Sequence, residues 1–485
     1  MGLSGDLSHL NRDDPFHVKY RGSTVWTEVR GGLVAFLAMS YTMPVNVGVL
    51  GKAIPGMSTQ LHVAIALSAA IGCFLMGTLS GWPFMLAPGM GTNAFFTFTV
   101  VLGRGLPWQA ALAAVFVASC IFLILSVTGL RTLMIRCFPQ GVREAIGAGI
   151  GLFLTFIAFQ DSEGMGLTVS NKAVLVGLNS LSFDSYDAAK IWLSLLVLCV
   201  TAALYAIKMP GAPMFGILLG TTICWIEGWI RGEDATAFGY PFGLSGAHTD
   251  PQFHMYLPKG ILEVPRLDGL SGAFVDGLKF ATNEHAAEFW SAVLTFCYTD
   301  LLDATGTFFA VAKFAGLADA SGQLPIGQQN MAYIADAFAA MCGSMLGVST
   351  VATYVESGAA VSDGAKTGLS SLVTGACFLA SVFLAPLVSA IPPLATGPIL
   401  LLVGSLMFGE VKNVDWQDYE ESMPAFLTIV TMAFTFNIGY GIIFGMVMWI
   451  VVQLLLMPYR FFKGIDPLLR IRGPLSDEQD AELSV

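Results

Sequence analysis

Three acidic residues lie in apolar stretches of this chain, where a lipid environment would make them costly. Asp300 and Asp303 lie near the middle of the membrane-length apolar run 289–312, and Glu356 lies in the short stretch STVATYVESGAA. An aspartate at the centre of a membrane-spanning helix costs roughly 2.5–3.5 kcal/mol, and such residues are usually functional or paired. We therefore expect these carboxyl groups to accept hydrogen bonds from a ligand, to carry a proton, or to do both.

Asp300 and Asp303 are three residues apart, so they share one helix face. The neighbouring hydroxyl groups, including that of Thr299, offer a second interpretation, in which the two acids belong to a structural hydrogen-bond network. This alternative weighs more on Asp303 than on Asp300. Glu356 has its own alternative, the capping of a short helix.

A second polar break lies in the first half of the chain, in the stretch LAPGMGTNAFF that contains Gly91, Thr92 and Asn93. Its glycines and prolines disfavour one continuous helix. The stretch predicts an extended segment around 84–91 that leads into a half-helix starting near Thr92 or Asn93. The Asn93 amide could donate and accept hydrogen bonds to a ligand, or it could cap the half-helix.

Several aromatic side chains near these breaks could stack on a planar ligand. The candidates are Tyr41, Phe95 and Tyr298, and Phe96 and Tyr354 are further ones. The chain contains 35 phenylalanines, so ordinary packing is the competing interpretation for each ring.

The composition is that of an integral membrane protein. Of 485 residues, 55% are hydrophobic and 12% are charged, and the mean hydropathy is +0.70, whereas soluble chains carry about 25% charged residues. The net charge of −11 gives no indication of nucleic-acid binding. There is no Walker loop, metal-spaced Cys/His cluster or nucleophile elbow, so we expect no ATP, metal or other cofactor and no enzymatic activity.

The apolar runs fall into two sets of seven, which predicts an all-α polytopic protein with 14 transmembrane segments. A cytoplasmic segment 1–28 precedes a first repeat at 29–230, and an extracellular loop 231–288 separates it from a second repeat at 289–457 and a cytoplasmic tail 458–485. The third segment of each set is the broken one, which is typical of a transporter site built from inverted repeats. The Lys and Arg distribution places both termini in the cytoplasm.

These segments resemble the AzgA-like purine permeases, eukaryotic type, within the nucleobase–ascorbate transporter superfamily. The resemblance rests on motifs along nearly the whole chain: TEVRGGLVAFLAMSYTMPVNVGVL, APGMGTNAFF, FWSAVLTFCYTDLLDATGTFFAVAKFAGL, STVATYVESGAA and PAFLTIV. Two departures affect fine specificity rather than membership: Ala365-Lys366 stands where Gly-Arg is common, and Met432-Ala433 stands where Met-Pro is usual.

The resemblance implies that a core domain (segments 1–4 and 8–11) slides against a gate domain (5–7 and 12–14) as an elevator. It implies that Asn93, Asp300 and Glu356 contact a purine between segments three and ten. We also expect the adjacent Thr92 and Thr299 to take part in substrate binding. Gly91 and Asp303 would be needed for transport, and the proton would be carried by Glu356 or Asp300. We expect a homodimer in the plasma membrane that imports adenine, guanine and hypoxanthine, and adenine-type cytokinins as a further candidate.

Two other functions remain as alternatives. A sulfate-permease-type anion transporter has a similar architecture, but its site should offer cations or bare helix N-termini rather than carboxylates. A non-transporting receptor or enzyme has no supporting motif. The sequence leaves open which purine is preferred and whether protons or sodium ions drive transport.

Overall fold

The computed structural model is mostly helical, and it describes residues 16–130, 138–160, 164–171, 175–179, 186–231, 262–314 and 326–463, together with the single residues 181, 258 and 260. Within these ranges, seven helices are long and apolar enough to cross a membrane. The prediction of a helical integral membrane protein is confirmed. Residues 232–257, 259 and 261 of the predicted loop 231–288, and residues 464–485 of the predicted tail 458–485, lie outside the described residues.

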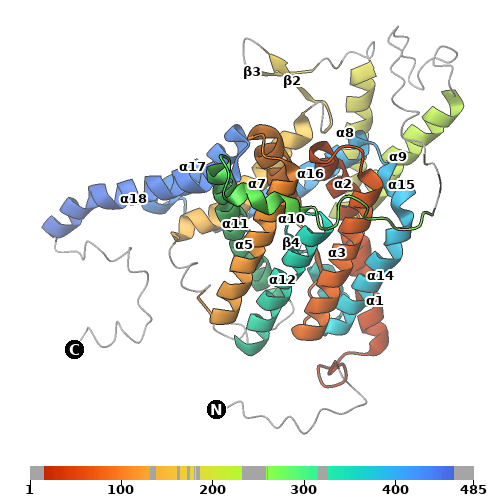
Figure 1. The fold of residues 1–485 in the computed structure, drawn as a ribbon, viewed down its shortest axis with the longest axis horizontal. Coiled ribbons are helices and arrows are strands. Elements are labelled where there is room, and N and C mark those ends of the chain that lie inside the picture. Colours follow the sequence, from red (N-terminus) through yellow and green to blue (C-terminus); the bar gives the residue numbers. More distant parts are fainter. Residues whose placement is uncertain are drawn as a thin grey trace. The chain divides into compact units, whose positions relative to one another are not determined.

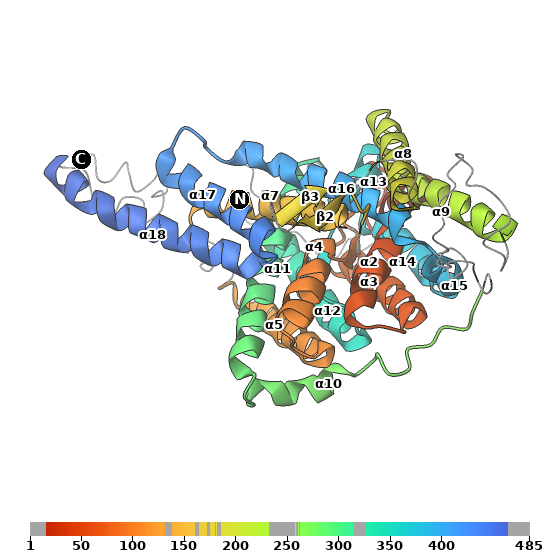
Figure 2. The ribbon, with the colours of Figure 1, turned by 90° about the horizontal axis from the view of Figure 1, so that it is seen from above.

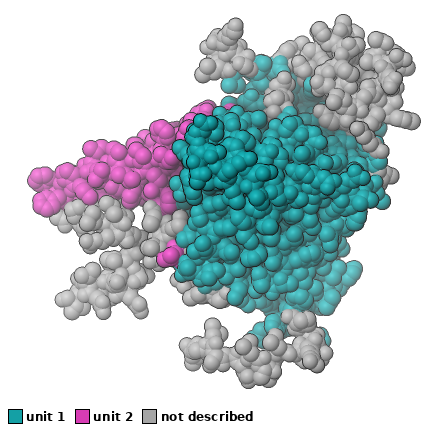
Figure 3. Space-filling model, viewed as in Figure 1, with its two compact units in different colours: residues 1–129, 154–403 teal, residues 130–153, 404–485 magenta. Residues whose placement is uncertain are grey.

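The chain divides into two compact units, coloured separately in Figure 3. Unit 1 comprises residues 1–129 and 154–403, and unit 2 comprises 130–153 and 404–485. All the predicted site residues belong to unit 1.

The elements of the first half of the chain, drawn in Figure 1, include helices where the sequence predicts apolar runs. They are α1 (Val25–Met39), α2 (Thr42–Ala53), α3 (Ser58–Leu79), β1 (Leu86–Pro88), α4 (Met90–Ala94), the π-helix η2 (Phe95–Gly103), α5 (Trp108–Thr128), α7 (Gln140–Phe159), β2 (Thr168–Asn171), β3 (Leu175–Leu178), α8 (Tyr186–Ala206) and α9 (Ala212–Arg231). The β2–β3 hairpin lies in a polar stretch for which the sequence predicted no strand.

The second half follows with a similar succession of long and short helices. The elements are α10 (Phe274–Gly277), η4 (Leu278–Ala281), α11 (Ala286–Phe314), α12 (Ile326–Leu346), β4 (Val351–Thr353), α13 (Ser357–Ser362), α14 (Gly368–Ser381), η5 (Val382–Leu384), α15 (Ala385–Ser389), α16 (Pro393–Phe408), η6 (Gly409–Asn413), α17 (Tyr419–Thr435) and α18 (Ile438–Lys463). The departure at Met432-Ala433 lies inside α17, which has no break there.

The two broken segments pair with each other through β1 and β4. The strands are antiparallel, with Leu86 opposite Thr353 and Pro88 opposite Val351. Backbone groups that no helix satisfies find partners across this pair: Gly89 N donates to Thr350 O at 3.0 Å, and Tyr354 N to Met85 O at 3.0 Å. Because lipid offers no hydrogen bonds, an unwound backbone is tolerated only where protein satisfies it in this way.

Helix α3 is the buried centre of unit 1 and lies beside α14 and α12 (Figures 1 and 2). Small residues allow this close approach. A Cβ added at Gly77 would lie 2.5 Å from the carbonyl oxygen of Gly368, and one at Gly72 would lie 2.9 Å from the Cβ of Leu86. Glycine is therefore required where α3 meets the start of α14 and strand β1.

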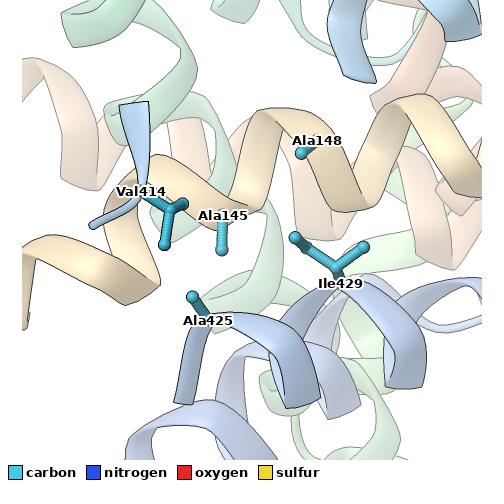
Figure 4. Packing of buried hydrophobic residues seen from close by; sticks show 5 residues of the cluster. All are labelled: Ala145, Ala148, Val414, Ala425 and Ile429. Carbon is cyan, nitrogen blue, oxygen red and sulfur yellow. The ribbon is translucent and has the colours of Figure 1, made fainter. Parts of the chain in front are cut away.

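Unit 2 has a small aliphatic core of its own. Ala145 and Ala148 of α7 pack on Ala425 and Ile429 of α17, with Val414 beside them (Figure 4). In the same unit, the buried Arg460 of α18 forms an ion pair with Glu420, the second residue of α17. The pair lets a cation lie in an otherwise apolar setting.

Candidate functional site

Glu356 immediately precedes half-helix α13, and a tyrosine from the first apolar run holds it. The run is interrupted after α1, and α2 begins at Thr42, so Tyr41 lies at the junction. Its hydroxyl donates a hydrogen bond of 2.6 Å to Glu356 Oε1. Tyr41 is almost fully buried, and Glu356 occupies the N-cap position of α13 without making a side-chain cap. The capping alternative for Glu356 therefore has no support from the hydrogen bonds.

Asn93 lies in half-helix α4 and is completely buried. The half-helix begins at Met90, slightly earlier than the sequence predicted, and its N-cap residue is Gly89 rather than Asn93. The Asn93 amide nitrogen donates to Asn46 Oδ1 at 2.8 Å. Its carbonyl oxygen has no hydrogen-bond partner among the described residues. A buried unpaired acceptor costs about 1–3 kcal/mol, so it indicates a place where a ligand can donate.

The neighbouring residues of α4 contribute to the junction of the two breaks. Thr350 Oγ1 donates to Thr92 Oγ1 at 2.9 Å, and Thr92 Oγ1 donates to the Gly89 carbonyl at 3.0 Å. Thr92 thus ties the first broken segment to the second. Gly91 lies in the first turn of α4, directly before Thr92.

Helix α11 carries Asp300 to the same region, because it packs against β4, α13 and α4. Asp300 is 2% exposed and the adjacent Thr299 is 1% exposed. The Thr299 hydroxyl has no partner among the described residues. Tyr298 is also buried on this helix. Asp303 belongs to α11, but its side chain is outside the described residues, so its predicted role stays a prediction.

The aromatic candidates have different surroundings. The Phe95 ring packs edge-on against Phe296 of α11, with 5.1 Å between centroids, and Arg104 lies over it at 5.9 Å. The Tyr354 hydroxyl donates to Pro88 O at 2.6 Å. Phe95 therefore contributes to the packing of η2 on α11, whereas Tyr41 contacts an acid of the site.

Sequence reasoning missed two buried polar residues in this region. Asn46 of α2 is completely buried, and its amide nitrogen donates to Pro88 O at 2.9 Å. Asp336 of α12 is completely buried and accepts from Thr353 Oγ1 at 3.4 Å. The available signal was simple: each is a polar side chain inside an apolar run, as Asp300 is.

Together these groups make a site rich in hydrogen-bond acceptors. The Asn93 carbonyl oxygen and the Glu356 carboxyl group lie in the two broken segments that the β1–β4 pair joins, and the Asp300 carboxyl group lies on α11, which packs against β4 and both half-helices. Such a site suits a neutral ligand with several N–H donors and disfavours an anion, because like charges repel. A carboxylate in a protein interior can also take up a proton.

The fold and the site define an integral membrane permease. The family model Xan_ur_permease, described as the permease family, matches residues 27–444. The chain belongs to this family, that of the nucleobase–ascorbate transporters, and the resemblance seen in the sequence motifs is confirmed.

Relatives with known names cover most of the chain. It is 34% identical to the efflux pump notK' of Aspergillus versicolor over 475 residues, which covers 89% of this chain and 79% of the relative. It is 33% identical to the adenine permease AdeP of Escherichia coli over 440 residues (90% and 89% of the two chains). It is 32% identical to the guanine/hypoxanthine permease PbuG of Bacillus subtilis over 436 residues (88% and 90%).

Two solved structures with a similar fold are those of anion transporters. The transmembrane domain of the cyanobacterial bicarbonate transporter BicA aligns with a TM-score of 0.57 at 14% identity, covering 87% of this chain and 97% of that domain. SLC26A9 aligns with a TM-score of 0.59 at 12% identity, covering 92% and 68%. At these identities the likeness concerns the fold alone.

Proposed function

We propose that this protein is a secondary active importer of purine nucleobases, with adenine, guanine and hypoxanthine as substrates. The observation that carries the proposal is the buried Asn93 carbonyl oxygen, which lacks a partner among the described residues, in a half-helix joined through β1 and β4 to Glu356. The adenine and guanine/hypoxanthine permeases among its relatives support the choice of substrate.

Purines fit the acceptor-rich site chemically. They are planar and neutral, and each carries N–H donors on its rings or amino group. The Asn93 carbonyl oxygen, Glu356 and Asp300 would accept from those donors, with Thr92 and Thr299 beside them. A carboxylate has about four lone-pair sites, so Glu356 retains acceptor capacity while it holds the Tyr41 hydroxyl.

Protons are the proposed coupling ion. In this proposal Glu356 or Asp300 takes up a proton on the outside, binds the purine, and releases both in the cytoplasm. Asp303 and Gly91 serve the movement rather than the binding. Because neutralising a buried carboxylate lowers the cost of moving it through lipid, protonation would make the loaded site easier to move.

The proposed movement is of the elevator type. Fourteen segments in two inverted repeats would form a core domain that carries the site and a gate domain against which it slides. We further propose that the protein lies in the plasma membrane as a homodimer with both termini in the cytoplasm. Adenine-type cytokinins, which keep the ring N–H and one N–H of the 6-amino group, are candidate additional substrates.

Uptake of radiolabelled adenine and hypoxanthine into purine-transport-deficient cells tests the proposal. We expect accumulation that increases at acidic external pH and collapses when a protonophore is added, whereas replacing sodium has no effect. The protein must be shown at the cell surface in the same cells. Absence of uptake of both purines with normal surface expression would disprove the function.

The fold favours one rival, an anion transporter of the sulfate-permease type, because BicA and SLC26A9 share it. The charge of the site argues against an anion transporter, because the Glu356 and Asp300 carboxylates would repel a bound anion. Flux of sulfate and bicarbonate into vesicles containing the purified protein decides between them. Anion flux that purines do not inhibit would favour the rival.

A further inference from the structure

A chain of side-chain hydrogen bonds runs from strand β1 through α2 to the site. Asn46 Nδ2 donates to the carbonyl oxygen of Pro88 at 2.9 Å, and Asn46 Oδ1 accepts from Asn93 Nδ2 at 2.8 Å. Asn46 and Asn93 are both completely buried.

The direction of this chain is imposed by the backbone. A carbonyl oxygen can only accept hydrogen bonds, so Asn46 must turn its NH₂ group toward Pro88. The Tyr354 hydroxyl donates to the same oxygen at 2.6 Å, which fills both of its lone pairs. Asn46 therefore presents its oxygen to Asn93, and Asn93 must use its NH₂ group to meet it. The Asn93 oxygen is left facing away from Asn46, without a partner among the described residues.

We propose that Asn46 is a specificity-determining positioning residue that fixes the Asn93 amide as a hydrogen-bond acceptor toward the substrate. The inference rests on the proposed purine transport and adds to it. A free asparagine could rotate its amide and match either a donor or an acceptor on the ligand. With Asn46 in place, Asn93 forms a hydrogen bond only with a purine that presents an N–H group to its carbonyl oxygen.

Adenine and hypoxanthine are a suitable pair of probes because they have nearly the same shape. On the six-membered ring, adenine donates from its 6-amino group and accepts at N1, whereas hypoxanthine donates from N1–H and accepts at O6. An amide fixed as an acceptor must discriminate between these reversed patterns. An amide free to rotate discriminates less.

The test is direct binding of the two labelled purines to the purified full-length protein, reported as the ratio of their dissociation constants. In the wild type we expect the ratio to differ from one by about tenfold. Asn46→Ala and Asn46→Ser should move it toward one by threefold or more, since neither side chain fixes the direction of the Asn93 amide. Asn46→Asp should keep the wild-type ratio even if both affinities fall, because its protonated carboxyl group donates to Pro88 O and its other oxygen can only accept from Asn93.

Two controls separate positioning from general damage. Asn437→Ala removes another buried asparagine, which lies in unit 2, and should leave the ratio unchanged. In an Asn93→Ala background, Asn46→Ala should have no further effect on the ratio, because it acts through Asn93. If Asn46→Ala does not fold, Asn46→Ser is used in its place for the same measurement.

The inference is overturned if the wild-type ratio lies within twofold of one, or if the alanine and serine variants keep it. It is also overturned if Asn46→Asp shifts the ratio as much as Asn46→Ala does. Failure of the wild type to bind either purine would instead contradict the proposed function itself.

Discussion

The two broken segments of unit 1 have the same plan but expose their polar groups differently. Each has a three-residue strand followed by a short half-helix, α4 in one and α13 in the other. Asn93 in the first is completely buried, whereas Glu356 in the second is partly exposed. A neutral amide occupies the enclosed position, and the ionisable group occupies the more accessible one.

The same part of the first apolar run contacts both broken segments, which we call the first arm (β1 and α4) and the second arm (β4 and α13). Tyr41, at the junction of α1 and α2, holds Glu356, and Asn46, one turn into α2, holds Asn93. The comparison suggests a division of labour in which the first arm selects the ligand and the second carries the charge. The predictions that follow test this division, from the largest expected effect to the smallest.

Glu356→Gln should have the largest effect, because it removes the charge while keeping the size of the side chain. Hydrogen bonds to charged groups contribute about 1.5–3 kcal/mol, so purine affinity should fall about 10- to 150-fold. The remaining uptake should lose its dependence on external pH. Measurement of uptake from pH 5 to 8, with surface labelling as the control, checks both effects. Unchanged pH dependence would remove Glu356 from the coupling mechanism.

Asn93→Ala should weaken purine binding by about 2- to 13-fold, the equivalent of one neutral hydrogen bond of 0.5–1.5 kcal/mol. Unlike Glu356→Gln, it should leave the pH profile of uptake unchanged. Competition binding at two pH values provides the measurement. A changed pH profile would contradict the separation of the two arms.

Tyr41→Phe should reduce affinity by about threefold, because Glu356 keeps its charge and loses one neutral donor. The substitution also separates two interpretations of Tyr41. If the ring stacks on the purine, Tyr41→Leu should be much worse than Tyr41→Phe, since Phe keeps the ring. If the hydroxyl alone matters, the two variants should bind purine equally well. Equilibrium binding of hypoxanthine to the purified variants decides.

Arg30→Met should have the smallest effect. Arg30 of α1 donates to the Asp363 carboxylate at 2.7 Å and to its backbone oxygen at 3.0 Å, just after α13 ends. The Arg30 side chain is 53% exposed, and exposed ion pairs contribute about 0–1 kcal/mol. A thermal unfolding scan of the purified protein should show a decrease of a few degrees at most. A large loss of purine binding without loss of stability would mean that the half-helix needs this anchor to function.

The sequence could predict the breaks, because glycine, proline and misplaced polar residues are local signals. It therefore located β1 and the start of α4 to within a few residues, and it identified the second break as the stretch that holds β4 and α13. Asn93, Asp300 and Glu356, which it selected, lie at α4, α11 and α13, and α11 packs against both half-helices. It could not predict Asn46 as the partner of Asn93, because that contact depends on how α2 packs beside α4. The sequence also did not predict the β2–β3 hairpin. Its strands, TVSN and LVGL, have four residues each, which is too short to show a clear hydrophobic alternation within a polar link.

The pairing of β1 with β4 has a consequence for how the protein is made. Tyr354 and Pro88 are 266 residues apart in the chain, and synthesis proceeds at about 5–20 residues per second. About 13 to 53 seconds therefore pass between the synthesis of Pro88 and that of Tyr354, and β1 cannot pair with β4 until then. During this interval the backbone groups of β1 lack the partners that the second broken segment provides in the finished fold. Substitutions that weaken the strand pair should accordingly lower the amount of protein that leaves the site of synthesis, before any change in the affinity of the assembled molecules is seen.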